Sequence, residues 1–147
     1  MVMKWKKTIL TLFSIFFFAF LLNYFWESLH GFSLYENQHI DSGEYVLMIN
    51  YMSVMDALTI VGIFWVVCIF VKDIFWLEHF HKKGIMWMLF WGLVVGAVAE
   101  YKAVYFTHDW HYNQYMPVIL GVGLSPLIQL SITGWVSIWL TKKMIYP

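Results

Sequence analysis

The sequence predicts an all-α membrane protein, with four transmembrane helices in a single domain over residues 1–147. Of its 147 residues, 61% are hydrophobic and 12% are charged, whereas soluble domains carry about 25% charged residues. Four long apolar stretches, each near or above the roughly 20 residues that cross a bilayer, are separated by short polar segments. Short connections favour antiparallel neighbours, so we expect an up-down bundle. We place the spans at residues 8–29, 45–71, 84–106 and 117–140.

The first span follows a basic N-terminal segment, in which Lys4, Lys6 and Lys7 precede an uncharged run that reaches Trp26. Such a pattern is also found in signal peptides, but the bulky residues after the run do not suit cleavage. We therefore expect a retained helix. The chain then becomes polar and acidic between residues 31 and 44, which indicates a loop.

The second and third spans each contain one conspicuous acid, Asp56 and Glu100. Residues 72–83 between them mix charged and aromatic side chains, which predicts a short helix lying in the membrane interface. In the third span Gly92 and Gly96 allow another helix to approach closely, and Glu100 should face the same partner. That partner can belong to this chain or to a second copy, so a homo-oligomer through these glycines is one expectation.

The fourth span carries a stripe of small and polar residues spaced four apart: Gly121, Ser125, Gln129 and Thr133. This spacing places them on one helical face, which we expect to point inward. Proline removes a backbone hydrogen bond, so Pro126 is expected to bend the helix near its middle.

Topology follows from the lysines. Eight of the nine lie at the N-terminus, in residues 72–83 or at the C-terminus, and only Lys102 falls near the opposite side. The positive-inside rule therefore predicts that both termini are cytoplasmic, in a bacterial or archaeal cytoplasmic membrane. The chain has no arginine and no net charge, which argues against nucleic-acid binding.

One face of the first span carries Asn23, Glu27 and His30, spaced i, i+4 and i+7. The Glu-x-x-His spacing also supplies two metal ligands in carboxylate-bridged bundles, although this chain has no second copy of it. His108 and His111 could complete a metal site with His30. The alternative is that these groups are solvated at helix ends, and the residues identify no cofactor.

Asp56 lies near the middle of the second span, where a charged side chain costs about 2.5–3.5 kcal/mol on insertion scales. We expect it to hydrogen-bond across the bundle to Ser125 or Gln129. This contact could serve packing alone, or it could belong to a functional site.

Two short pieces of the chain, Asn23-x-x-Trp26-Glu27 and Trp110-x-Tyr112 followed by Pro126, resemble small membrane carotenoid (lycopene) cyclases. Those proteins carry acidic residues that protonate a polyene, and the resemblance implies a proton-donor role for Glu27. The family's Pro-x-Glu-Glu pair is absent here, because the chain reads Pro126-Leu127-Ile128-Gln129.

Two classes of function remain open, beside a packing or partner subunit with no site of its own. In the first, Glu27, Asp56 and Glu100 form an acid/base set, supported by Asn23, Ser125 and Gln129, that acts on or binds an apolar lipid or isoprenoid. In the second, the same carboxyl groups form part of a proton- or metal-ion-coupled small transporter. The cytoplasmic halves of the second and third spans are almost wholly apolar, which favours a one-sided, non-cytoplasmic site with membrane lipid as its partner.

Overall fold

The structure is a computed structural model and describes residues 2–36 and 41–147. Four helices in this part of the chain are long and apolar enough to cross a membrane, which confirms the all-α, four-span fold class. They are α1 (Val2–Ser33), α2 (Ser42–Val71), α4 (Lys82–Lys102) and α5 (Leu124–Ile145). Shorter elements complete the chain: α3 (Trp76–His79), a π-helical turn η1 (Ala103–Thr107), and the strands β1 (Val118–Ile119) and β2 (Val122–Gly123).

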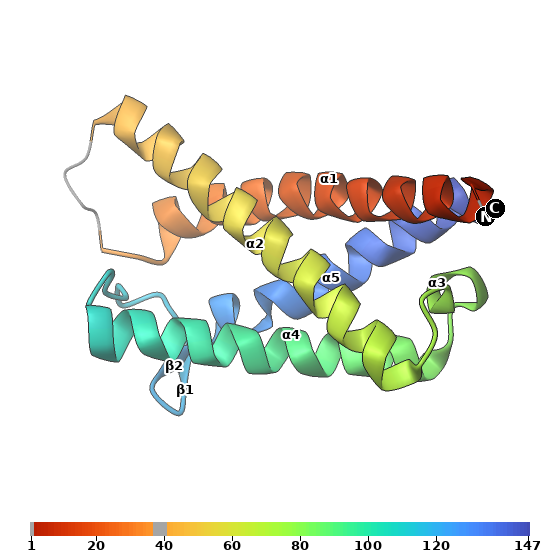
Figure 1. Cartoon of the computed structure of the whole chain (residues 1–147). Coiled ribbons are helices and arrows are strands. Elements are labelled where there is room, and N and C mark those ends of the chain that lie inside the picture. Colours follow the sequence, from red (N-terminus) through yellow and green to blue (C-terminus); the bar gives the residue numbers. More distant parts are fainter. Residues whose placement is uncertain (1, 37–40) are drawn as a thin grey trace.

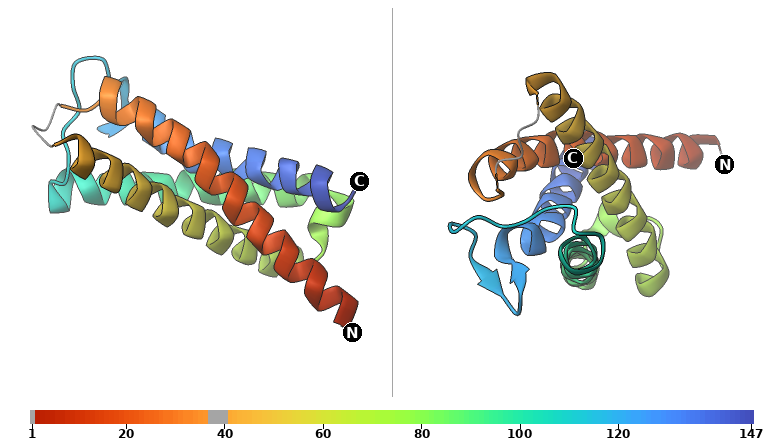
Figure 2. Two further views of the ribbon diagram at one scale, coloured as in Figure 1. Left: turned by 90° about the horizontal axis from the view of Figure 1, so that it is seen from above. Right: turned by 90° about the vertical axis from the view of Figure 1, so that its left-hand side faces the viewer.

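The four long helices alternate in direction. Both chain termini and α3 lie at one end of the bundle, and the α1–α2 and α4–α5 connections lie at the other (Figure 1). The lysine-rich segments are therefore gathered at a single end, as the up-down arrangement requires. Helix α1 packs on α2 and α5, and α4 packs on α5. Figure 2 shows the same bundle from above and from its end. The cytoplasmic position of the lysine-rich end remains a prediction.

The bundle core is apolar and aromatic, and it is closed at the lysine-rich end by the α2–α4 connection. Trp76 and Leu77 of α3 are fully buried, and the Trp76 ring lies 5.7 Å from that of Phe64. The predicted short helix is present and turns two apolar side chains into the bundle, while its position relative to the membrane interface remains a prediction. Burial inside the bundle removes the apolar surface of Trp76 and Leu77 from water, so α3 closes this end of the core.

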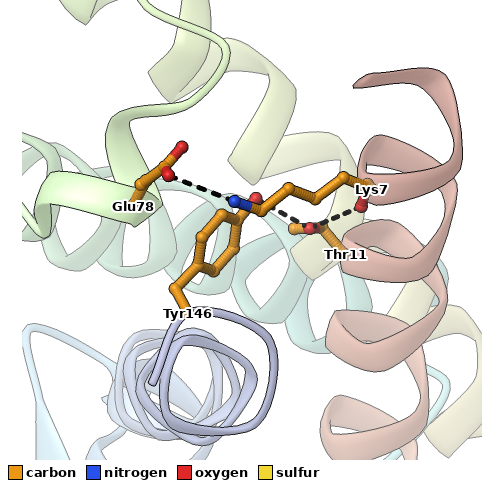
Figure 3. Close-up of polar contacts among 4 residues, drawn as sticks. All are labelled: Lys7, Thr11, Glu78 and Tyr146. Atoms are coloured by element: carbon orange, nitrogen blue, oxygen red, sulfur yellow. Dashed lines mark hydrogen bonds and ion pairs between the residues drawn. The ribbon is translucent and has the colours of Figure 1, made fainter. Parts of the chain in front are cut away.

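A polar cluster fastens the start of α1 to the same end of the molecule (Figure 3). Lys7 Nζ lies 3.1 Å from Glu78 Oε1 and 4.1 Å from the centre of the Tyr146 ring. Thr11 Oγ1 and Tyr146 Oη form a hydrogen bond of 3.0 Å. These contacts join α1, α3 and the residue that follows α5.

The glycines of α4 are the points at which α5 approaches most closely. A Cβ on Gly92 would lie 2.6 Å from the Ser131 Cα, and one on Gly96 would lie 2.9 Å from the Leu127 carbonyl oxygen. Close helix approach at these two residues is thus confirmed, but the partner is α5 of the same chain. A homo-oligomer near these glycines remains a prediction, although α5 of the same chain already covers this face.

The fourth helix begins at Leu124, later than the predicted residue 117. Residues 118–123 form a tight β1–β2 hairpin, with Leu120 and Gly121 at positive φ. Pro126 consequently lies in the first turn of α5, where its missing N–H would have had no helical partner in any case. The predicted bend near the middle of the helix is therefore wrong, because Pro126 lies in the first turn of α5 and not in its middle.

Candidate functional site

A cavity of about 450 Å³ lies at the end of the bundle opposite the termini. Figure 1 shows that the N-terminal end of α2 diverges from the C-terminal end of α4 there. The wall is mostly apolar and aromatic, with several acids. It is formed by Glu27, Gly31, Phe32, Tyr35, Glu36, Ser42, Tyr45, Met48, Ile49, Met52, Asp56, Gly96, Ala99, Glu100, Asp109, Trp110, Pro126, Gln129 and Leu130.

Three of the predicted site residues meet at the inner part of this cavity, each on a different helix. The Gln129 side-chain nitrogen of α5 lies 2.6 Å from Glu27 Oε1 of α1 and 2.8 Å from Asp56 Oδ2 of α2. The expected contact between Asp56 and Gln129 is confirmed. A polar group in the membrane is stabilised when other helices provide its hydrogen-bond partners, and here three helices provide them.

The Gln129 amide nitrogen in this cluster has more acceptors around it than it has hydrogens. Gln129 Nε2 also lies 3.1 Å from Asn23 Oδ1, so three acceptors surround a nitrogen that has two hydrogens. Glu27 and Asp56 thus both lie against one amide nitrogen, from two different helices. Because two carboxylates repel at short range, a single proton held between Glu27 and Asp56 would stabilise the pair.

Helices α1 and α5 meet along an antiparallel polar seam that contains this cluster. Asn23 Oδ1 accepts from Thr133 Oγ1 at 3.2 Å, Glu27 accepts from Gln129, and His30 Nε2 contacts Ser125 Oγ. The expectation that Asn23, Glu27 and His30 share one face is confirmed. The inward direction of Ser125, Gln129 and Thr133 is confirmed as well, whereas Gly121 lies in the hairpin turn before α5 and does not belong to this helical face.

His30 is fixed in a way that does not suit a metal ligand. The Trp26 indole nitrogen donates to His30 Nε2 at 2.7 Å, so the lone pair of that nitrogen is already engaged and the ring proton belongs on Nδ1. His30 is 3% exposed, and Nδ1 has no partner in the described part of the chain. A metal would need a free ring nitrogen lone pair, which this arrangement does not offer.

The other two predicted metal ligands lie apart from His30. His108 ends η1 with a positive φ of 54°, and His108 and His111 are both exposed. Within residues 2–36 and 41–147, no three His, Cys, Asp or Glu side chains are close enough to hold a metal ion. The structure therefore does not assemble the metal site proposed for His30, His108 and His111.

Glu100 forms a second polar centre on the wall contributed by α4. Its Oε1 accepts hydrogen bonds from Tyr112 Oη at 2.7 Å, from Trp110 Nε1 at 3.1 Å and from Tyr35 Oη at 3.4 Å. Tyr112 Oη also accepts from the backbone N–H of Gly123 at 2.8 Å, which ties this centre to the start of α5.

The two loops that carry these donors are joined by backbone pairing. Tyr35 and Tyr112 form an antiparallel bridge, and Glu36 N donates to the His111 carbonyl at 3.0 Å. Burial is the main cause that raises the pKa of Tyr35, with Glu100 and Glu27 adding to it. Burial and the hydrogen bond to Glu100 likewise raise the pKa of Tyr112. Both phenols therefore remain donors to the carboxylate throughout the physiological range.

Sequence reasoning did not single out Tyr35 and Tyr45 as site residues, although both line the cavity. Tyr45 Oη donates to the Ser28 carbonyl at 3.3 Å, so its ring crosses from α2 to α1. Neither tyrosine belongs to a periodic pattern with an acid: Tyr35 lies just after the end of α1, and Tyr45 lies in the first turn of α2. The one available signal was the excess of aromatic residues next to acids in this half of the chain.

Comparisons of the chain with known protein families, with curated proteins and with solved structures found no match. The fold and the cavity thus define an integral membrane protein of four helices with an acidic, aromatic cavity at one end.

Proposed function

We propose that this cavity binds an apolar lipid or isoprenoid and that the Glu27–Asp56 pair exchanges a proton with it. The observation that carries the proposal is the meeting of two carboxyl groups at Gln129, beside a cavity lined by Phe32, Met48 and Met52. An apolar wall suits an apolar ligand, and a small number of convergent polar groups orients it.

A shared proton makes the pair suited to acid/base work. One carboxyl group can release the shared proton to the ligand, and the Gln129 amide, which donates to both groups, stabilises the negative charge left behind. The surrounding apolar wall keeps water away from the transfer. The resemblance to lycopene cyclases, in which acids protonate a polyene, is consistent with Glu27 as the donor.

A one-sided site supports this proposal over transport. All residues that line the cavity come from the C-terminal parts of α1 and α4, the N-terminal parts of α2 and α5, and the two adjoining loops. With both termini cytoplasmic, the site would face the non-cytoplasmic half of the membrane. A lipid could enter from the bilayer between α2 and α4, where these helices diverge (Figure 1).

Deuterium exchange tests this proposal. The protein is placed in lipid nanodiscs prepared from a native membrane extract and incubated in D2O, and bound lipids are then extracted and weighed by mass spectrometry. We expect one class of lipid to be retained and to gain deuterium. Glu27→Gln and Asp56→Asn should retain the lipid without the gain, because amides preserve shape and hydrogen bonding but cannot pass on a proton.

The control is Glu44→Gln, which removes an exposed carboxylate in the first turn of α2, outside the cavity wall. It should retain both lipid and deuterium gain. Met52→Trp, which fills the cavity, should prevent retention. Equal exchange in wild type and in both carboxyl variants, with folding verified by circular dichroism, would show that these acids serve packing alone.

A further inference from the structure

The cavity has a strong excess of negative groups. Its wall contains five acidic residues, namely Glu27, Glu36, Asp56, Glu100 and Asp109, and among the described residues it contains no lysine or histidine. Burying a carboxylate in a membrane protein is costly unless a positive charge or several donors compensate it. Glu36 and Asp109 are exposed and therefore solvated, so the deficit of positive charge concerns the three acids on the helices.

Glu100 is the clearest case of a buried acid in this wall without a compensating positive charge. It is 4% exposed, and the three hydrogen bonds that it receives all end on Oε1. Three donors on one oxygen favour the ionised form of a carboxyl group. The second oxygen, Oε2, has no donor among the described residues, although Glu100 lines the cavity.

Aromatic rings surround the same carboxyl group. Tyr35 and Trp110 direct their polar atoms to Glu100 Oε1, and their rings lie 5.9 Å apart at an angle of 69°. Both residues also line the cavity, as does Tyr45. These aromatic side chains therefore enclose the carboxyl group from the loop side and occupy its first oxygen.

We propose that the ligand of this cavity is a membrane-soluble amine: an apolar body with a protonated nitrogen that binds Glu100 Oε2 among Tyr35 and Trp110. This inference rests on the proposed function, because it names the substrate class of the same cavity. The apolar body occupies the region of Met48, Met52 and Leu130. The ammonium group provides the missing positive charge, and Glu27 and Asp56 remain available for proton exchange.

Matched ligands separate the charge of the head group from the apolar chain. Decylamine and decan-1-ol have the same chain, and an alkylammonium like that of lysine, with a pKa of about 10.4, is protonated at pH 7.5. Binding to the full-length protein in zwitterionic nanodiscs is measured by equilibrium dialysis, with empty nanodiscs as the blank. We expect decylamine to bind the wild type at least tenfold more tightly than decan-1-ol.

Glu100→Gln should abolish this preference and leave the affinity for decan-1-ol within about twofold, whereas Glu44→Gln should retain the preference. Equal affinities of the two ligands for the wild type would overturn the inference and leave the proposed function intact. A preference that survives Glu100→Gln at full strength would overturn the assignment to Glu100. Absence of saturable binding for either ligand would count against the proposed function as well. The wild-type comparison stands by itself if the variant does not fold.

Discussion

Replacement of Gly92 by alanine should destabilise the bundle, and the same replacement at Gly62 should not. Both glycines lie inside long helices, so both variants gain helix propensity, up to about 1 kcal/mol. Around Gly62 there is no atom within 4 Å of the new methyl group. At Gly92 the methyl group would meet the Ser131 backbone, with Cα at 2.6 Å and N at 2.7 Å. The two variants therefore differ in the clash alone.

The size of the effect follows from these distances. Ordinary van der Waals contact begins near 3.4 Å, so α4 and α5 must separate by about 0.8 Å, because backbone atoms cannot rotate away. Overpacking of this kind costs about 1–3 kcal/mol. The hydrogen bond from Ser131 Oγ to the Leu89 carbonyl, 2.8 Å long, joins the same two helices and would be stretched. Membrane hydrogen bonds average about 0.6 kcal/mol.

We expect Gly92→Ala to lower the free energy of unfolding by about 1–3 kcal/mol and Gly62→Ala to leave it unchanged or slightly higher. The measurement is reversible unfolding in mixed dodecylmaltoside and sodium dodecyl sulfate micelles, followed by near-ultraviolet circular dichroism. Gly96→Ala should behave like Gly92→Ala, since its methyl group would lie 2.9 Å from the Leu127 carbonyl oxygen. Equal stability of the Gly92 and Gly62 variants would refute the packing of α4 on α5 described above.

Three further predictions concern topology, the polar cluster in Figure 3 and the buried phenols. With the native cysteine removed, a cysteine at Tyr115 should react with an impermeant reagent from outside the cell, and one at Glu78 should not; the reverse pattern would overturn the orientation. A double-mutant cycle with Lys7→Met and Glu78→Gln should give a coupling below about 1 kcal/mol, because both side chains are partly exposed. A coupling above 2 kcal/mol would contradict this. Since the pKa of Tyr112 is raised above its ordinary 10.0, Tyr112→Phe should leave the phenolate absorbance step near pH 10 intact. The stability that depends on neutral Tyr112 should be complete below pH 10 and decline above it; a smaller absorbance step near pH 10 in Tyr112→Phe than in the wild type would refute the burial argument.

Much of the fold could be predicted from helical periodicity and from the cost of polar groups in the membrane. Four apolar stretches gave the four helices. The spacing of Asn23, Glu27 and His30 predicted that they share one helical face, and the i, i+4 stripe of the last helix predicted which face of α5 points inward. These are local patterns, and the contact between Asp56 and Gln129 follows from them because few polar partners exist at that depth.

The remaining features depend on contacts between segments far apart in the chain. Residues 118–120 are apolar and resemble the start of a helix, yet they form a hairpin because the positive φ of Gly121 allows a tight turn. The pairing of Tyr35 with Tyr112 joins two loops that share no periodicity. In the same way, the sequence shows that Gly92 admits a close neighbour but contains no signal for which helix that neighbour is.

The length of α2 has a consequence for the bilayer around the protein. Its 30 residues span about 45 Å at 1.5 Å per residue, against a hydrocarbon thickness of about 30 Å. A helix of this excess length is accommodated by tilt, and in Figure 1 α2 runs obliquely across the bundle. The tilt is also what moves its N-terminal end away from α4 beside the cavity. A thicker membrane would favour a more upright α2, so the angle at which α2 crosses the bundle should depend on lipid composition.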